Sequence, residues 1–401
     1  MGPQRQPAGR TREAHVRWGA GMTTTPTLRV NEPREIVSLV PYRLGFRPRD
    51  SAVAVSLRAP RGSVGLVMRV DLSAIGDPVV GRQVARAMVG TLGRDRASSS
   101  VLVVYTDEDP RGVDGAAGRA VEHFREAAEA LLGPAAVWVV TDHGYLSYDC
   151  TGACCPPGGR PLRELESTQV SARMVLEGAT IAESRDAVVR IAAADSQRRR
   201  VVARTRRRWQ ERGAEAAQDG PGAVEWWRAE SLASWRLAVD HVAGRAPAHA
   251  RAPWGRVEAG LTDRRVRDAV LASFVPGAGD LPERSLRGTT VAAPEDAALG
   301  RLTAALMGPG PGVRPPQPET RWHEQALEAV VAHGRAGAQA PALTLLALLA
   351  WWRGDGARAQ ILLDRALRDD AEHRLAVLLD SALAAGLGPG WTRTEEPDAA
   401  G

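Results

Sequence analysis

The segment "SVLVVYTDEDPRGVDGAAGRAVEHFREAAEALLGPAAVWVVTD" (Ser100–Asp142) decides the fold class of this chain. Both of its ends, Ser100–Asp107 and Ala135–Asp142, are short apolar runs of the length that buried strands have. Between them, Gly118–Gly133 has apolar side chains at helical spacing and ends at a glycine, as helices often do. A strand, a helix and a second strand in this order predict a sheet with helices packed on it.

The neighbouring segments extend this sheet. "SAVAVSLR" (Ser51–Arg58) and "VGLVMRVDL" (Val64–Leu72) are separated by a turn-like gap and predict a β-hairpin. Val80–Arg94 has the apolar spacing of a helix, and Tyr145–Cys150 is expected to pair with the strand before it. The N-terminal half is therefore predicted to be α/β, with a mixed sheet and flanking helices.

From Gly178 on, the apolar pattern is almost entirely helical. Val224–Val242 contains tryptophans that we expect in the core. Pro341–Asp355 and Gly356–Asp370 predict two helices joined by a short turn, and Ala371–Gly390 predicts a third. The first two resemble a tetratricopeptide-type helical hairpin, which cannot bury its apolar faces alone. We therefore expect this all-α region to end in a hairpin that packs on the preceding helices or on a protein partner.

These patterns predict a division of the chain into six parts. The first is polar, and "MTTTPTLRV" from Met22 reads like a natural start, so we expect a disordered or over-extended N-terminus. The parts are residues 1–27 (N-terminal extension), 28–165 (α/β domain), 166–307 (helical domain), 308–320 (Pro/Gly linker), 321–390 (C-terminal helical hairpin region) and 391–401 (disordered tail).

Four motifs stand in a fixed order along the chain. They are "LVPYRLGFRPRDSAVAVSL" (Leu39–Leu57), "RVDL" (Arg69–Leu72), "SYDCTGACCPPGGRPL" (Ser147–Leu162) and "LAWWRGDGARAQILLDRAL" (Leu349–Leu367). Together they resemble a family of uncharacterised proteins from high-GC Gram-positive bacteria, known only as a domain of unknown function. The resemblance covers roughly Leu28 to Leu387 and implies the architecture above, but it implies no activity.

Composition excludes several enzyme classes. The chain has no lysine, and all 52 of its basic side chains are arginine. Without lysine there can be neither a Walker A phosphate loop nor Schiff-base catalysis. "WHEQALEAVVAH" (Trp322–His333) begins like a zinc-protease helix, but Leu327 stands where the second histidine should be. These absences favour a protein without enzymatic activity.

All three cysteines lie within six positions, in "HGYLSYDCTGACCPPGG" (His143–Gly159). Cys150 and Cys154 have the spacing of zinc ligands, and Cys155 and His143 could complete a set of four. A reactive thiol would instead need a nearby cation, for which His143 and Arg160 are the local candidates. The third alternative is that the thiols are small apolar side chains that anchor a loop on the sheet.

An acidic loop, Thr106–Gly115, follows the central strand at the edge of the sheet where ligands often bind. Its carboxylates could hold a divalent cation, or they could form a solvated loop that caps the following helix. The candidate residues are Asp107, Glu108, Asp109 and Asp114.

One predicted helix, "SQRRRVVARTRRRWQERG" (Ser196–Gly213), accounts for the net positive charge of the chain. It follows Glu183–Asp195, a predicted helix with Ser184 at its N-cap. Between Asp195 and Arg212, eight arginines face only two acids, so the rest of the chain is nearly neutral. Four arginines recur at helical spacing and form one charged stripe: Arg200, Arg204, Arg208 and Arg212.

Two interpretations of the arginine helix remain open. We expect its arginines to pair with acids of the next helix, such as Glu225, Glu230 or Asp240. The alternative is that the helix at Arg198–Arg212 binds a nucleic-acid backbone.

The leading functional hypothesis is a cytoplasmic, non-enzymatic interaction or regulatory protein with a protein partner at the C-terminal hairpin. The absence of a signal peptide and the few cysteines favour the cytoplasm, and no apolar run is long enough to span a membrane. No cofactor is predicted, although zinc remains open. One alternative is a thiol- or metal-dependent enzyme or sensor that uses Cys150–Cys155, and another is a nucleic-acid-associated protein.

Overall fold

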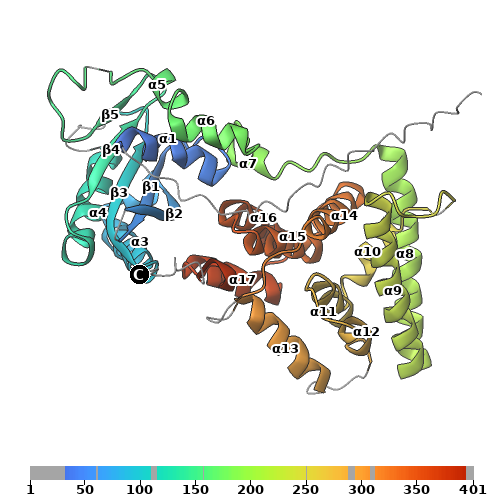
Figure 1. Cartoon of the computed structure of the whole chain (residues 1–401). Coiled ribbons are helices and arrows are strands. Elements are labelled where there is room, and N and C mark those ends of the chain that lie inside the picture. Colours follow the sequence, from blue (N-terminus) through green and yellow to red (C-terminus); the bar gives the residue numbers. More distant parts are fainter. Residues whose placement is uncertain are drawn as a thin grey trace, which may run out of the picture.

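The computed structural model describes residues 32–59, 62–109, 115–156, 158–249, 251–287, 294–307 and 312–393. Figure 1 shows a sheet with its helices on one side of the molecule and a larger group of helices on the other. The expectations for residues 1–27, for Asp114 and for residues 394–401 lie outside the described residues. The division into six parts stays a prediction.

The sheet has the mixed topology that the sequence predicts. Its order is β2-β1-β3-β4-β5, and only β3 and β4 are parallel among these neighbours. A parallel pair needs a crossover, and α4 supplies it between β3 and β4. The strands are β1 (Ser51–Arg58), β2 (Ser63–Asp71), β3 (Ala97–Tyr105), β4 (Ala136–Val140) and β5 (Tyr145–Ser147).

Both faces of the central strands are covered. Alternate residues of a strand point to opposite faces, so Ala54 and Leu102 join one buried cluster while Val55 and Val103 join another. The first cluster lies under α3 (Gly81–Arg94) and α4 (Ala116–Leu132). The second contains α1 (Pro33–Leu44) and continues into the helical half of the chain. Burial on both faces explains why these strands are apolar runs without polar alternation.

The larger helical part is built mainly from nine described helices that follow the sheet in the chain (Figure 1). They are α8 (Ser196–Asp219), α9 (Pro221–Val242), α10 (Trp254–Gly260), α11 (Arg264–Ser273), α13 (Pro294–Met307), α14 (Glu319–His333), α15 (Ala340–Trp352) and α16 (Gly356–Asp369), and α17 (Arg374–Ala384) completes them. Shorter helices are α2 (Leu72–Ile75), α5 (Arg163–Glu166), α6 (Gln169–Leu176), α7 (Arg185–Val188) and α12 (Leu281–Arg284), and a 3-10 turn covers Gly390–Arg393. No described helix is both long and apolar enough to cross a bilayer.

The C-terminal hairpin of α15 and α16 is present as predicted. Nearly every residue of α15 is buried, because the helix packs against α14, α16 and α17. A helix that is apolar on all sides is stable only when neighbours surround it. The preceding helix and the rest of the hairpin therefore cover its apolar faces. A protein partner for this region stays a prediction.

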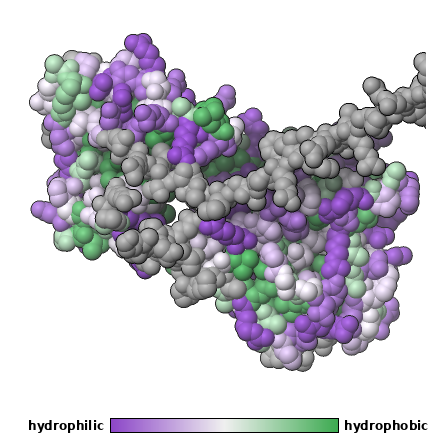
Figure 2. Space-filling model, viewed as in Figure 1, coloured by the Kyte–Doolittle hydropathy of each residue, from purple (hydrophilic) through white to green (hydrophobic). Residues whose placement is uncertain are grey.

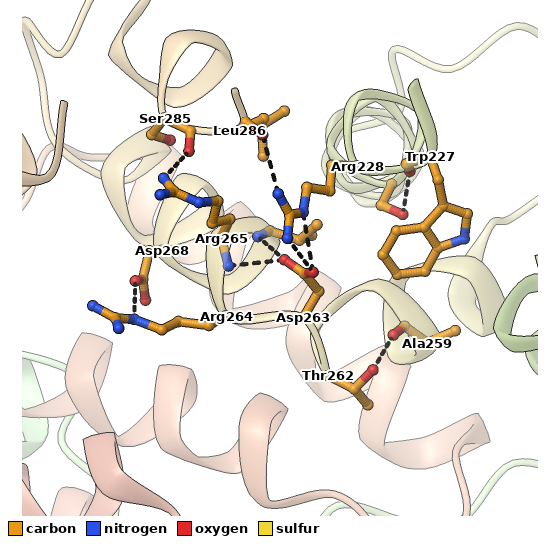
Figure 3. A network of polar contacts seen from close by, with 12 residues as sticks. Trp227, Arg228, Ala259, Thr262, Asp263, Arg264, Arg265, Asp268, Ser285 and Leu286 are labelled. Carbon is orange, nitrogen blue, oxygen red and sulfur yellow. Dashed lines mark hydrogen bonds and ion pairs between the residues drawn. The ribbon is translucent and has the colours of Figure 1, made fainter. Parts of the chain in front are cut away.

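A polar network ties α9, α11 and α12 together (Figure 3). One carboxylate oxygen of Asp263 accepts from the backbone N–H of Arg265, at 2.9 Å, and so caps α11. Its other oxygen accepts from Nε of Arg228 on α9, at 3.0 Å. The Arg265 guanidinium reaches the carbonyl oxygen of Ser285, at 2.9 Å, just after α12.

Several predicted elements are shorter than expected; the helix predicted at Ala371–Gly390, for example, is α17 (Arg374–Ala384). Ser184 does cap a helix, since its hydroxyl accepts from the N–H of Ala187, but the helix ends at Val188 and does not continue toward Asp195. Beyond it, the chain bonds to other helices: the carbonyl of Val189 accepts from Arg365, at 2.9 Å. Likewise β5 ends at Ser147, where the prediction extended it to Cys150, because the chain turns there into the loop that carries the three cysteines.

Candidate metal-binding site

The thiol loop, residues 148–159, carries the three cysteines. It leaves β5 after Ser147 and returns to the strand at Arg160, which bridges to Tyr145. At its base, Tyr145 and Arg160 exchange two backbone hydrogen bonds, of 2.9 and 2.7 Å. The turn before β5 is held by Thr141, whose hydroxyl accepts from the N–H of Gly144, at 3.1 Å. These bonds fix both ends of the loop on the edge of the sheet.

Two glycines allow the chain to cross itself at this base. A Cβ on Gly144 would lie 2.5 Å from the carbonyl oxygen of Gly158, and one on Gly159 would lie 2.9 Å from the backbone of Tyr145. Gly159 also has φ +82, a conformation that side chains rarely adopt. The close backbone approach therefore explains why glycines stand on both sides of the cysteines.

Tyr145 reinforces the base through its side chain. Its hydroxyl donates to Oε2 of Glu164, at 2.9 Å, and the Arg160 guanidinium lies 5.8 Å from its ring centroid. Burial, and then the hydrogen bond to Glu164, raise the pKa of Tyr145 to about 12. Tyr145 therefore stays protonated and acts as a fixed hydrogen-bond donor at physiological pH.

The loop brings the three thiols together. The Sγ atoms of Cys150 and Cys154 are 3.1 Å apart, and all three sulfurs lie within 4.8 Å of one another. The backbone N–H of Cys155 donates to the carbonyl of Gly152, at 3.0 Å, which forms the turn between the thiols. Cys155 is half-buried and packs against the cluster under α4, whereas Cys154 is exposed. The loop thus combines contact with the sheet core and three thiols that could hold a metal ion.

The protonation of the cluster argues against an activated nucleophile at Cys154. Its hydrogen bond with Cys150, and the like charge that Cys150 would carry, raise the pKa of the Cys154 thiol. A nucleophilic cysteine needs the opposite shift. A bound cation would instead offset the repulsion between neighbouring thiolates, so the arrangement suits a metal ligand set better.

The other predicted site residues lie apart from the sulfurs. His143 is exposed, its backbone N–H donates to Thr141 Oγ1 at 3.1 Å, and it is not part of the ligand group. Arg160 forms an ion pair with Glu164, at 3.0 Å. The histidine of the proposed four-ligand set is therefore not brought to the thiols.

The acidic loop shows no cation site among its described residues. Asp107 Oδ1 accepts from the backbone N–H of Asp142, at 2.8 Å, so this carboxylate holds the turn after β4. Glu108 and Asp109 belong to no group of three or more possible ligands within the described ranges, where the three thiols form such a group. Asp107 thus has a structural role that its place after β3 did not predict.

The arginine helix is α8, and its contacts correct one expectation. The four stripe residues are exposed, and none of them forms an ion pair with a described residue: Arg200, Arg204, Arg208 and Arg212. Asp240 pairs with Arg245 instead, at 2.9 Å. The expected pairing of the stripe with Glu225, Glu230 or Asp240 is therefore wrong. The acids of α9 do not reach it, because α9 packs on the apolar side of α8, which carries Val202 and Trp209.

Sequence reasoning missed the internal anchor of α8. Nη1 of Arg206 lies 3.0 Å from Oε1 of Glu258 on α10, and both side chains are largely buried. Nothing in the local sequence marks Arg206 among the eight arginines. Its partner lies more than one helix away, so only the fold shows which arginine turns inward.

Comparison with known families agrees with the motif resemblance. A family model described as a domain of unknown function (DUF4192) matches residues 33–390, which is most of the chain. No curated protein and no solved structure matches the chain. The match therefore points to a family of unknown function, and the functional argument depends on the residues themselves.

Proposed function

Since the chain belongs to the family DUF4192, a domain of unknown function, we propose its role from its residues. It is a cytoplasmic, non-enzymatic regulatory protein that binds one Zn²⁺ ion through the thiolates of Cys150, Cys154 and Cys155. The observation that carries this proposal is the convergence of three sulfurs on one loop tip.

The spacing of the sulfurs supports zinc. Ligands at the usual Zn–S distance of about 2.3 Å in a tetrahedron lie roughly 3.8 Å apart. The sulfurs of Cys150 and Cys154 are somewhat closer, at 3.1 Å, and the widest pair is within 4.8 Å. Small side-chain rotations therefore suffice to form a three-thiolate set, without moving the loop base.

The surroundings of the thiols support a reversible, regulatory site. Cys154 is exposed, so a fourth position would be open to water or to an exogenous ligand. Cys155 is half-buried against the sheet core, so the ion would join the loop tip to the sheet. Binding would then order the loop between Cys150 and Cys155, which is a change that a partner could recognise.

Titration of the metal-free, reduced protein with Cd²⁺ and Zn²⁺ tests the site. We expect thiolate-to-cadmium absorption that saturates at one ion per chain. We also expect competition by Zn²⁺ with an apparent Kd below about 1 µM, or ~8 kcal/mol. Because metal binding must displace thiol protons, the apparent affinity should fall as the pH falls below the raised pKa of Cys154.

Variants separate this site from the four-ligand alternative. Cys150→Ser and Cys154→Ser should each abolish saturable binding, since two thiolates remain. His143→Ala is the matched control and should bind as the wild type does, because His143 is not in the ligand group. Stoichiometric binding that survives Cys150→Ser, or no saturable binding at all, would refute the proposal.

A further inference from the structure

We propose that the exposed face of α8 is a binding surface for the sugar-phosphate backbone of duplex nucleic acid. The surface is the arginine stripe of Arg200, Arg204, Arg208 and Arg212. This inference is independent of the thiol site and would stand if no metal bound there.

The stripe residues are exposed and lie outside the face that holds α8 in the fold. Val202, Trp209 and Ala216 recur every seven residues and are buried. Nε1 of Trp209 donates to Ser231 Oγ on α9, at 2.9 Å, and fixes the rotation of α8 about its axis. The stripe residues, one turn apart, therefore point outward. Figure 1 places α8 at the edge of the helical part, and hydrophilic residues are prevalent on that side in Figure 2.

The arginines of α8 divide according to their partners. Arg206 turns inward to Glu258, while Arg198 and Arg207 pair with acids of their own segment, at 3.1 and 3.7 Å. The stripe residues have no ion pair among the described residues. Their positive charge is thus not neutralised by the protein, and it is concentrated in a chain whose remaining charges nearly cancel.

The dimensions of the stripe fit a phosphate backbone. At 1.5 Å per residue, Arg200 and Arg212 are about 18 Å apart along the helix, with a guanidinium roughly every 6 Å. Successive phosphates of a duplex strand rise about 3.4 Å along the axis and also wind around it, so a straight helix of this length can reach only about four of them. Arginine binds phosphate oxygens through two parallel N–H bonds, which suits this array better than isolated point charges would.

Other anionic partners fit the surface less well. The stripe contains no exposed aromatic side chain on which unpaired bases could stack, so a single strand gains little. Val201, which is 47% exposed, is the one large apolar side chain of α8 that is strongly exposed. A lipid surface needs an apolar face of several such residues beside the charges. Sequence-tolerant binding to duplex backbone is therefore the best match.

Fluorescence anisotropy with a labelled duplex of mixed sequence tests the surface. If about four phosphates are neutralised, the slope of log K against log salt should be near −3.6. The affinity should then fall roughly 150-fold between 50 and 200 mM salt. The double variant Arg204→Glu/Arg208→Glu should abolish binding at the higher salt concentration. Its salt dependence should also be less steep, by the contribution of about two phosphates.

A charge-matched control variant distinguishes the effect of the stripe on binding from the effect of a change in net charge. Arg86 and Arg374 are exposed arginines on α3 and α17, and Arg86→Glu/Arg374→Glu changes the net charge by the same amount. We expect this control to bind as the wild type does, with circular dichroism confirming that both variants are folded. Equal loss in the control, no binding by the wild type at low salt, or stripe-dependent binding to anionic vesicles without binding to duplex would overturn the proposal.

Discussion

Acidification should destabilise this protein through one buried histidine, His323 on α14. Its side chain is only 9% exposed and packs between Trp235 and Phe274, with ring centroids 5.8 and 5.0 Å away. Its Nδ1 atom has no hydrogen-bond partner among the described residues. Desolvation is the largest cause that lowers the pKa of His323 to about 4, and the charge of Arg245 adds to it, while Glu319 acts in the opposite direction.

The direction of the pH effect on stability follows from proton binding to His323 in the folded and the unfolded state. The unfolded chain binds a proton at His323 with a pKa near 6.5, and the folded chain binds it only near 4. Falling pH therefore favours the unfolded state throughout this window, and stability is lost as the pH drops from about 6.5 to about 4. Between pH 7 and pH 5, protonation of this residue alone lowers the free energy of unfolding by about 2 kcal/mol.

Urea unfolding of the wild type and of His323→Phe at pH 7 and pH 5 measures this contribution. Phenylalanine keeps the ring between Trp235 and Phe274 but cannot bind a proton, and Nδ1 has no hydrogen bond to lose. We expect the free energy of unfolding to fall about 2 kcal/mol less in the variant than in the wild type. His249→Phe, at an exposed histidine, should leave the pH difference unchanged. Equal pH differences for His323→Phe and the wild type would refute the reasoning.

Two further predictions concern the anchors of the proposed surfaces. Glu258→Ala leaves Arg206 buried without its partner, so urea unfolding should show a loss of about 3 kcal/mol, and Glu258→Gln should lose less. Gly159→Ala places a Cβ 2.9 Å from the Tyr145 backbone at φ +82, whereas Gly158→Ala meets no atom within 4 Å at φ +84. Both should destabilise through the backbone, by about 1 kcal/mol, and Gly159→Ala should cost measurably more. Equal melting temperatures for the two alanine variants would contradict the close approach.

The strands of the sheet could be predicted because buried strands have apolar sequences that can be recognised without knowledge of the fold. β3 is buried on both faces over most of its length, and β4 is buried on one face and half-buried on the other, so both are continuous apolar runs. Helix α1 was missed because Pro41 stands inside it, and an interior proline argues against a helix. The packing of Val37 and Val40 into the core outweighs that local penalty.

The candidate sites were predictable as residue types but not as geometry. The three cysteines lie within six positions of the sequence, so their convergence needed only one turn. The exclusion of His143 and the engagement of Arg160 by Glu164 depend on how the loop closes on Tyr145, which is a contact across the sheet edge. In the same way, the spacing of the arginines defines the stripe, but only packing decides that Arg206 turns inward.

The sheet separates the two proposed surfaces. Cys155 and Tyr148 pack against the cluster under α3 and α4, whereas Trp209 of α8 belongs to the cluster on the other face, which continues into the helical half. Coupling between them would need an element with two discrete arrangements that both surfaces influence. The central strands β1 and β3, which lie between the clusters, pair with a neighbour on each side and are largely buried, so they have little freedom to switch. Metal at the thiols and phosphate at α8 should therefore bind independently, and loss of one activity by mutation carries no information about the other.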